Sequence, residues 1–113
     1  MERRDTIILR KIVTEANIAV SMIRDYTLEE FIEDEKTKRA TCMTIINIGE
    51  LVKTLSPEVR SANSHVPWKD IAGFRDIAAH KYQTLRMKDV YDTVRLDLPN
   101  LVRSISEILN EVH

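Results

Sequence analysis

The sequence predicts an all-α protein, an antiparallel helical bundle of four to five helices folded as a single domain over residues 1–113. Three observations lead to this fold class. Two glycines and three prolines are too few for the many tight turns of an all-β chain. Strong helix formers, among them Leu, Ala, Glu, Lys and Arg, dominate the composition. Apolar residues also recur at intervals of three and four along most of the chain, which is the spacing of one helix face.

The first two helices are expected at residues 5–25 and 28–55. A single wide apolar stripe indicates the first helix. The segment from Thr27 to Glu30, TLEE, has the form of a capping box and predicts the start of the second helix. Gly49 lies in the apolar half of that helix, where a glycine costs about 1 kcal/mol relative to alanine. We therefore expect another backbone to approach Gly49 closely.

Two further helices follow in the middle of the chain. Ser56 and Pro57 predict the N-cap and the first residue of a short third helix. A polar loop at residues 61–65 separates it from a fourth helix at residues 67–80. Trp68, at the start of the fourth helix, is expected in the core rather than as a platform for base stacking.

The last helix is expected from residue 87 to about residue 111, after a short connection at residues 82–85. Its apolar positions keep the same phase on both sides of Pro99. We therefore predict one long helix with a bend at Pro99 rather than two helices. Tyr91 fits the apolar stripe of this helix and is interpreted as a packing residue.

Composition excludes several classes of protein. The net charge of −1 argues against a generic nucleic-acid binder, so any contact with RNA must come from a local basic patch. The single cysteine, Cys42, excludes an intramolecular disulfide and a cysteine-based metal site, and its apolar neighbours predict a buried thiol. No segment approaches the roughly 18 apolar residues of a membrane span, and no signal-peptide cleavage site is recognisable. We expect a cytoplasmic protein with no membrane partner.

Reactive side chains gather in one stretch, GFRDIAAHKY, at residues 73–82. Arg75 and His80 would point about 140° apart on a regular helix, so they share a face only if the helix ends or distorts near His80. Asp76 precedes His80 by four residues, so its carboxylate can accept a hydrogen bond from the ring and fix its tautomer. Alternatively, Asp76 can pair with Arg75 and draw it away from a substrate.

The context of this stretch matters more than its spacing, because Arg60 and His65 repeat the same spacing in a polar loop. Residues 69–88 carry five cations and two acids, a net charge of +3 that leaves −4 for the rest of the chain. A basic patch around a histidine can bind a phosphodiester. The candidate RNA- and phosphate-binding residues in this patch are Lys69, Lys81, Arg86 and Lys88.

These residue types fit metal-independent cleavage of RNA, in which the 2′-hydroxyl attacks the adjacent phosphorus. Histidine can serve as the acid or base, and the arginine fork can stabilise charge on the phosphate. Arg75 and His80 are therefore the candidate catalytic residues, with Asp76 supporting them. The acids at residues 29–35 are interpreted as a solvated helix face rather than an Mg²⁺ site, so no metal and no cofactor are expected. A symmetric homodimer would bring two copies of the pair into one cleft.

Four segments together resemble the HepT-like branch of the HEPN superfamily. They are IGE at residues 48–50, the Ser-Pro turn, PWKDIAGFRDIAAHKY at residues 67–82, and DLPNL at residues 97–101. The resemblance covers nearly the whole chain. Its most specific part is an arginine, four residues, a histidine, any residue and a tyrosine, placed shortly after Pro-Trp. The family often has a polar amide after the arginine, where this chain has Asp76.

The resemblance implies an all-helical homodimer in which the arginine–histidine motifs of both copies form a metal-independent ribonuclease site. It also implies a toxin of a toxin–antitoxin system, with a minimal nucleotidyltransferase antitoxin as its partner. Carried over to this chain, Arg75 and His80 are catalytic, and Tyr82 is the residue that the antitoxin modifies with AMP (AMPylation). An adenylylated phenol beside His80 would place a phosphate where that of the substrate should lie.

Other interpretations remain open. The chain can instead be a non-catalytic dimeric helical module that binds a nucleotide or docks a nucleotidyltransferase, or a purely structural bundle. Tyr82 can be a partly buried aromatic residue at a helix end. An enzyme loses its cellular effect when Arg75 or His80 is changed, whereas a docking module tolerates His80→Ala and still binds its partner.

Overall fold

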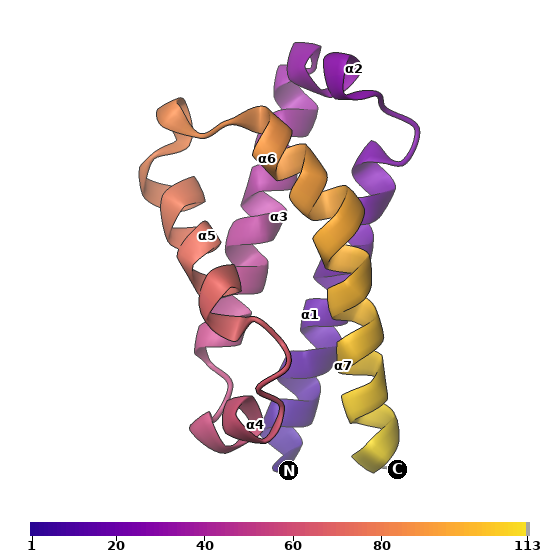
Figure 1. Cartoon of the computed structure of the whole chain (residues 1–113), viewed down its shortest axis with the longest axis vertical. Coiled ribbons are helices and arrows are strands. Elements are labelled where there is room, and N and C mark those ends of the chain that lie inside the picture. Colours follow the sequence, from indigo (N-terminus) through magenta and orange to yellow (C-terminus); the bar gives the residue numbers. More distant parts are fainter. Residues whose placement is uncertain (113) are drawn as a thin grey trace.

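Helical segments that alternate in direction form the bundle (Figure 1). The computed structural model describes residues 1–112, and the side chains of residues 1–110. Every regular element in this part of the chain is helical, which confirms the predicted all-α antiparallel bundle. The elements are α1 (Arg3–Ile23), α2 (Leu28–Glu33), α3 (Glu35–Lys53), α4 (Pro57–Ala62), α5 (Trp68–His80), the 3-10 turn η1 (Tyr82–Thr84), α6 (Met87–Asp92), the π-helical segment η2 (Thr93–Asp97) and α7 (Leu98–Val112).

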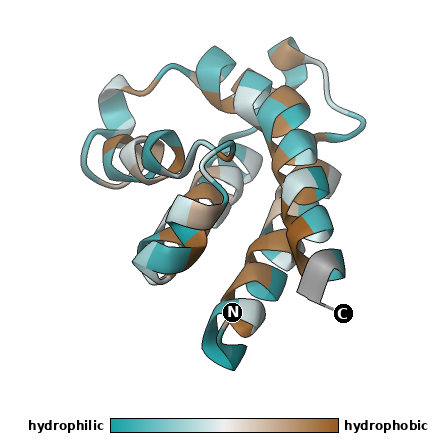
Figure 2. Cartoon of the chain, turned by 60° about the horizontal axis from the view of Figure 1, so that its bottom comes forward, coloured by the Kyte–Doolittle hydropathy of each residue, from teal (hydrophilic) through white to brown (hydrophobic). Residues whose placement is uncertain are grey.

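The hydrophobic core lies where α1 packs against α3 and α7, while α5 packs mainly on α3. Leu9, Ile12, Ile48 and Ile105 are among its fully buried side chains. Apolar and polar residues alternate along the helices (Figure 2), as expected for helices that bury one face. Burying one such aliphatic side chain contributes about 1.5–3 kcal/mol relative to leaving it exposed. Packing of these faces therefore holds the bundle together more than intrinsic helix propensity does.

Several residues lie where the sequence predicted. Trp68 and Tyr91 are buried in the core, and so is Cys42. Burial raises the pKa of the Cys42 thiol to about 11, which keeps it protonated and unreactive near neutral pH. Ser56 caps α4 as expected. Its backbone N and its Oγ also donate hydrogen bonds to the buried Asp5 of α1, at 3.0 Å and 2.9 Å. No helix within residues 1–112 combines the length and apolarity that a membrane crossing requires.

The predicted single helix at residues 28–55 is wrong, because the chain breaks at Asp34 into α2 and α3. The capping box of Thr27 and Glu30 does form at the start of α2. Asp34 then has extended backbone angles and caps α3 by accepting from the Thr37 backbone N at 3.0 Å. The Tyr26 hydroxyl donates to the same carboxylate at 2.6 Å. A hydrogen bond from a side chain eight residues earlier, outside both helices, thus stabilises a break that no glycine or proline indicates.

Acid is expected to weaken the fold through Asp34. The hydrogen bond from Tyr26, followed by those from Thr37, lowers the pKa of Asp34 to about 2. A carboxylate with a lowered folded pKa contributes stability that is complete above its unfolded value of about 3.9 and is lost as the pH falls further. Urea titrations should show a fall in the free energy of unfolding between about pH 4 and about pH 2 that flattens in Asp34→Asn. Equal slopes in the two proteins would contradict this role of Asp34.

The last helix is continuous from α6 to α7 but changes direction along the way (Figure 1). The π-helical segment η2 joins the two parts, and the Leu98 N–H donates to the Thr93 carbonyl five residues earlier. Pro99 follows in the first turn of α7 and has no N–H to donate to Arg95. The wider π turn accommodates this lost hydrogen bond. The long helix with a bend is confirmed, and its irregular turn lies just before Pro99.

Candidate functional site

Helices α3 and α5 come very close together at Gly49. A β-carbon built on Gly49 would lie 2.2 Å from Arg75 Cβ and 2.6 Å from Arg75 Cγ. The other glycine, Gly73 on α5, has nothing within 4 Å of such a β-carbon. The close approach predicted at Gly49 is therefore confirmed, and the segment that approaches it is the one that carries Arg75.

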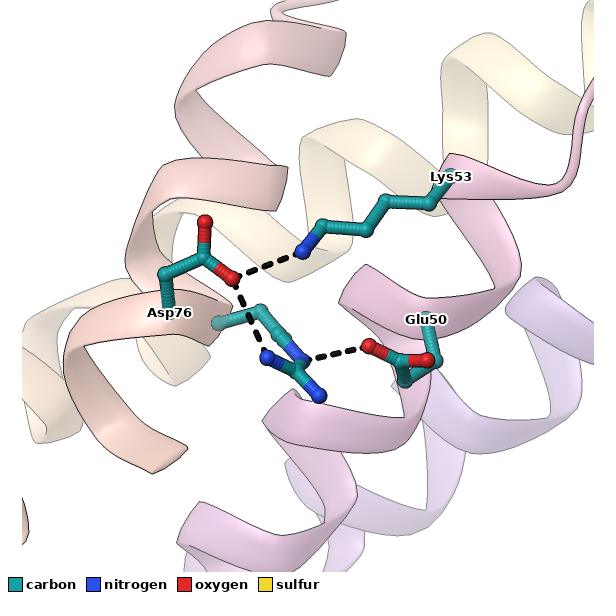
Figure 3. Close-up of polar contacts among 4 residues, drawn as sticks. Glu50, Lys53 and Asp76 are labelled. Carbon is teal, nitrogen blue, oxygen red and sulfur yellow. Dashed lines mark hydrogen bonds and ion pairs between the residues drawn. The ribbon is translucent and has the colours of Figure 1, made fainter. Parts of the chain in front are cut away.

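Arg75 lies between two carboxylates, those of Glu50 and Asp76. Its Nε is 2.6 Å from Glu50 Oε1 of α3, in an ion pair whose N–H bond is not aligned with the oxygen. Its Nη1 donates to Asp76 Oδ1 at 3.1 Å. Lys53 of α3 donates to that same oxygen at 2.7 Å (Figure 3). The four charges form one network with no net charge that joins α3 to α5.

Asp76 is bonded towards α3 rather than towards His80. Hydrogen bonds from Lys53 and then Arg75 hold the pKa of Asp76 below its usual range, so it carries a full negative charge near neutral pH. Among the described side chains, no hydrogen bond joins Asp76 to His80. Of the two roles considered for Asp76, the structure shows the pairing with Arg75, and the bond that would fix the His80 tautomer is not formed.

His80 is the last residue of α5, and its side chain is exposed. It makes no hydrogen bond or ion pair with any described residue. It borders a shallow depression together with Lys81 and Tyr82. Because α5 is regular up to His80, the Arg75 and His80 side chains leave the helix axis about 140° apart. No hydrogen bond or ion pair joins the two among the described side chains.

Tyr82 lies beside His80 in the 3-10 turn that follows α5 and is half-buried. The guanidinium carbon of Arg39, from α3, lies 5.0 Å from the centre of its ring, within the range of a cation–π contact. Burial is the largest cause that raises the pKa of Tyr82 above its usual value, followed by the nearby Cys42 and Glu35. The phenol is therefore fully protonated at neutral pH.

The four cations predicted to bind phosphate come from different segments. Lys81 directly follows His80 and borders the same depression, and Arg86 and Lys88 lie exposed at the start of α6. Lys88 is ion-paired with Asp92 at 2.6 Å. Lys69 lies at the opposite end of α5 from His80, about 16 Å away along the helix axis. Lys69 is therefore remote from the histidine.

Other candidate sites lie apart from this motif. An apolar groove of about 420 Å³ runs between α5 and α7, with Ile48, Phe74 and Leu101 among its lining residues. His65 also borders it, but Arg60, its partner in the repeated spacing, does not. Neither Arg75, His80 nor Tyr82 lines the groove. Within residues 1–110, no group of three or more His, Cys, Asp or Glu side chains is placed to hold a metal ion.

Residues 12–108 match the family described as Ribonuclease HepT-like. The chain belongs to this HepT-like family. The match includes the whole of α3 and α5, so the network around Arg75, the exposed His80 and the neighbouring Tyr82 all lie inside the HepT-like region. The resemblance seen in the sequence is thereby confirmed.

Known HepT-like relatives are similar over most of their length. A protein of Caldanaerobacter subterraneus named "Putative RNase" is 33% identical over 103 residues, which cover 91% of this chain and 92% of the relative. A protein of Methanocaldococcus jannaschii with the same description is 32% identical over 93 residues, or 82% of this chain and 77% of the relative. A "Probable ribonuclease HepT" of Thermococcus cleftensis is 29% identical over 87 residues, or 74% and 79%. No solved structure matches this chain.

Three residues of α3 that the sequence did not single out lie close to the motif in the HepT-like fold. They are Arg39, against Tyr82, and Glu50 and Lys53, in the network around Arg75. One signal pointed to Glu50, because it directly follows the glycine at which close approach was predicted. Nothing in the sequence marked Arg39 or Lys53, since their partners lie more than twenty residues away along the chain.

Proposed function

We propose that this HepT-like chain is the toxin of a toxin–antitoxin system and acts as a metal-independent endoribonuclease at a site formed across a homodimer. One observation carries the proposal: His80 is exposed and no described residue of its own chain bonds it, while Arg75 of the same motif is turned towards α3. The family match and the names of the relatives support ribonuclease chemistry.

Arg75 stabilises the charge that builds on the phosphate during the attack. A guanidinium presents fixed N–H donors that match phosphate oxygens, and such electrostatic stabilisation is often the largest contribution to catalysis. None of the described residues bonds its Nη2, so this nitrogen can donate to the substrate. Glu50 and Asp76 hold the rest of the guanidinium in place.

His80 transfers the protons. In the attack, the 2′-oxygen forms a bond to phosphorus while the bond from phosphorus to the 5′-oxygen breaks. One histidine accepts the proton of the 2′-hydroxyl, and a second donates a proton to the leaving 5′-oxygen. Each chain supplies one His80, so a homodimer provides both roles.

The experiment that tests the proposal is cleavage of RNA in the presence of EDTA. Purified wild-type protein should cleave, whereas Arg75→Ala and His80→Ala should not. Adding an excess of His80→Ala to wild-type protein should lower the activity per wild-type chain, because a mixed dimer holds only one of the two histidines. Activity that stays proportional to the amount of wild-type protein would argue against a site shared between two chains.

Neutralisation by a minimal nucleotidyltransferase antitoxin belongs to the same proposal, with Tyr82 as the acceptor of AMP from ATP. The Tyr82 hydroxyl attacks the α-phosphorus of ATP, loses its proton and releases pyrophosphate. Because the pKa of Tyr82 is raised, the phenol does not ionise by itself, and the antitoxin must supply the base. The added phosphate would lie beside His80 and block the site.

Tyr82→Phe is expected to abolish labelling of the chain by radioactive ATP and the nucleotidyltransferase, because phenylalanine has no hydroxyl. Tyr91→Phe is the matched control, since Tyr91 is buried in the core and its hydroxyl is already bonded to the Tyr26 carbonyl. Labelling that persists in Tyr82→Phe and disappears in another variant would assign the modification elsewhere. Binding of the antitoxin without any labelling would indicate that it only covers the site.

The alternative function is a non-catalytic dimeric module that binds a nucleotide or docks a nucleotidyltransferase. The partial separation of the basic residues favours neither reading by itself. No RNA cleavage by the wild-type chain, together with binding of the partner that is retained in His80→Ala, would support this alternative.

A further inference from the structure

We propose that Glu50 is a positioning residue that holds the Arg75 guanidinium in the orientation needed for phosphate; the inference rests on the proposed ribonuclease function. Glu50 belongs to α3, the helix that α5 approaches at Gly49. Gly49 and Glu50 are adjacent in the sequence. Together they determine where the Arg75 side chain begins and where its charged end lies.

The first argument is that the Glu50 carboxylate pairs with Arg75 and with no other described residue. Its carboxylate lies 2.6 Å from Arg75 Nε, and it has no other hydrogen bond or ion pair with a described residue. Asp76 differs, because it also accepts a hydrogen bond from Lys53 at 2.7 Å. Among the described residues, the charge of Glu50 is therefore neutralised by Arg75 alone. Asp76 can remain ion-paired with Lys53 if a phosphate displaces it from Arg75.

The second argument concerns which donors of the guanidinium remain. A guanidinium offers two paired edges to a phosphate, one formed by Nη1 and Nη2 and the other by Nε and Nη2. Glu50 lies at Nε and Asp76 at Nη1, so each carboxylate occupies one nitrogen of a different edge. Nη2, which belongs to both edges, has no partner among the described residues. If Asp76 moves to Lys53 alone, the Nη1–Nη2 edge becomes available for two bonds to phosphate while Glu50 still anchors the Nε side.

The third argument is exposure. The Arg75 side chain is 19% exposed and that of Glu50 is 52% exposed. Arg75 Nε is itself buried, but Glu50 is half-exposed and Arg75 keeps its bond to Asp76, so the loss of the Glu50 charge costs little stability. A substitution at Glu50 should therefore leave the fold intact, and its effect on the reaction can be measured separately from any effect on folding.

The test is steady-state cleavage of a short RNA oligonucleotide, labelled with a fluorophore and a quencher, by Glu50→Gln and Glu50→Ala. We expect kcat to fall at least about tenfold, because a loosely held catalytic group is displaced from its productive position. We expect KM to stay constant or to fall, because removal of a negative charge beside Arg75 favours RNA binding. The thermal unfolding temperature should not change. Glu58→Gln, at an exposed glutamate of α4 with no ion pair among the described residues, is the matched control and should behave as wild type.

Three outcomes would overturn the inference. An unchanged kcat would mean that Arg75 needs no anchor, and a raised kcat would mean that Glu50 competes with the substrate phosphate. A lower kcat accompanied by a lower unfolding temperature would mean that Glu50 acts through the fold. Arg75→Ala, measured in the same assay, separates this inference from the proposed function. If Arg75→Ala is inactive while the Glu50 variants match wild type, only the inference fails; if Arg75→Ala cleaves as well as wild type, the proposed function fails.

Discussion

Replacing either Arg75 or His80 with alanine should abolish both growth arrest and RNA cleavage when the chain is expressed on its own. Loss of a general acid or base lowers a rate by about 10²–10⁴-fold, and loss of a charge-stabilising donor lowers it by about 10²–10³-fold. His80 is exposed and makes no bond with the part of the chain that the structure describes, so its removal should not disturb the fold. Growth curves, total RNA and unfolding temperature should be recorded for each variant.

The chain supplies its own control for this experiment. Arg60 and His65 have the same spacing as Arg75 and His80, but His65 lies in an exposed loop beside the apolar groove. His65→Ala should arrest growth and degrade RNA as wild type does. Growth arrest that survives His80→Ala would remove the ribonuclease interpretation, and the site would then be a docking or nucleotide-binding surface.

Gly49→Ala should reduce both the stability and the activity of the protein. The new methyl group would lie 2.2 Å from Arg75 Cβ, an atom fixed to the backbone that cannot rotate away. The helices α3 and α5 must move apart, and overpacking of this kind costs about 1–3 kcal/mol. Alanine is favoured over glycine within a helix by about 1 kcal/mol, which offsets only part of the cost. Urea unfolding measures the first effect, and cleavage in EDTA measures the displacement of Arg75.

Gly73→Ala is the matched control, because it makes the same substitution on the partner helix where nothing lies within 4 Å of the added carbon. It should leave the free energy of unfolding unchanged or raise it by up to about 1 kcal/mol. If Gly49→Ala were as stable as Gly73→Ala, the close contact between the two helices would not exist in solution.

The fold could be predicted from the sequence wherever local signals agreed. Apolar spacing marked the long helices, the Ser56-Pro57 pair marked the start of α4, and Gly49 marked a close approach, although not the segment that makes it. The break at Asp34 could not be predicted in this way. It depends on the Tyr26 hydroxyl, and the acids on both sides of Asp34 continue the pattern of an exposed helix face. The helical pattern of the surrounding residues therefore obscured the N-cap at Asp34.

The candidate site was predictable only in part, because sequence spacing gives neighbours along one helix and not across two. It placed Asp76 within reach of both His80 and Arg75, and it could not choose between them. Lys53, on another helix, decides the matter by drawing the carboxylate towards α3. The same limit concealed Glu50 and Arg39, whose roles arise from the packing of α3 against α5 and η1.

The direction of His80, away from the Arg75 of its own chain, has a consequence for dosage. If a complete site requires two copies, the number of complete sites at low expression rises with the square of the chain concentration, by mass action. A cell that makes a few stray copies would then carry almost no activity, whereas a modest surplus over the antitoxin would switch it on steeply. The position of His80 at the end of α5 would in this way set a threshold concentration of the chain for activity, without any need for transcriptional control.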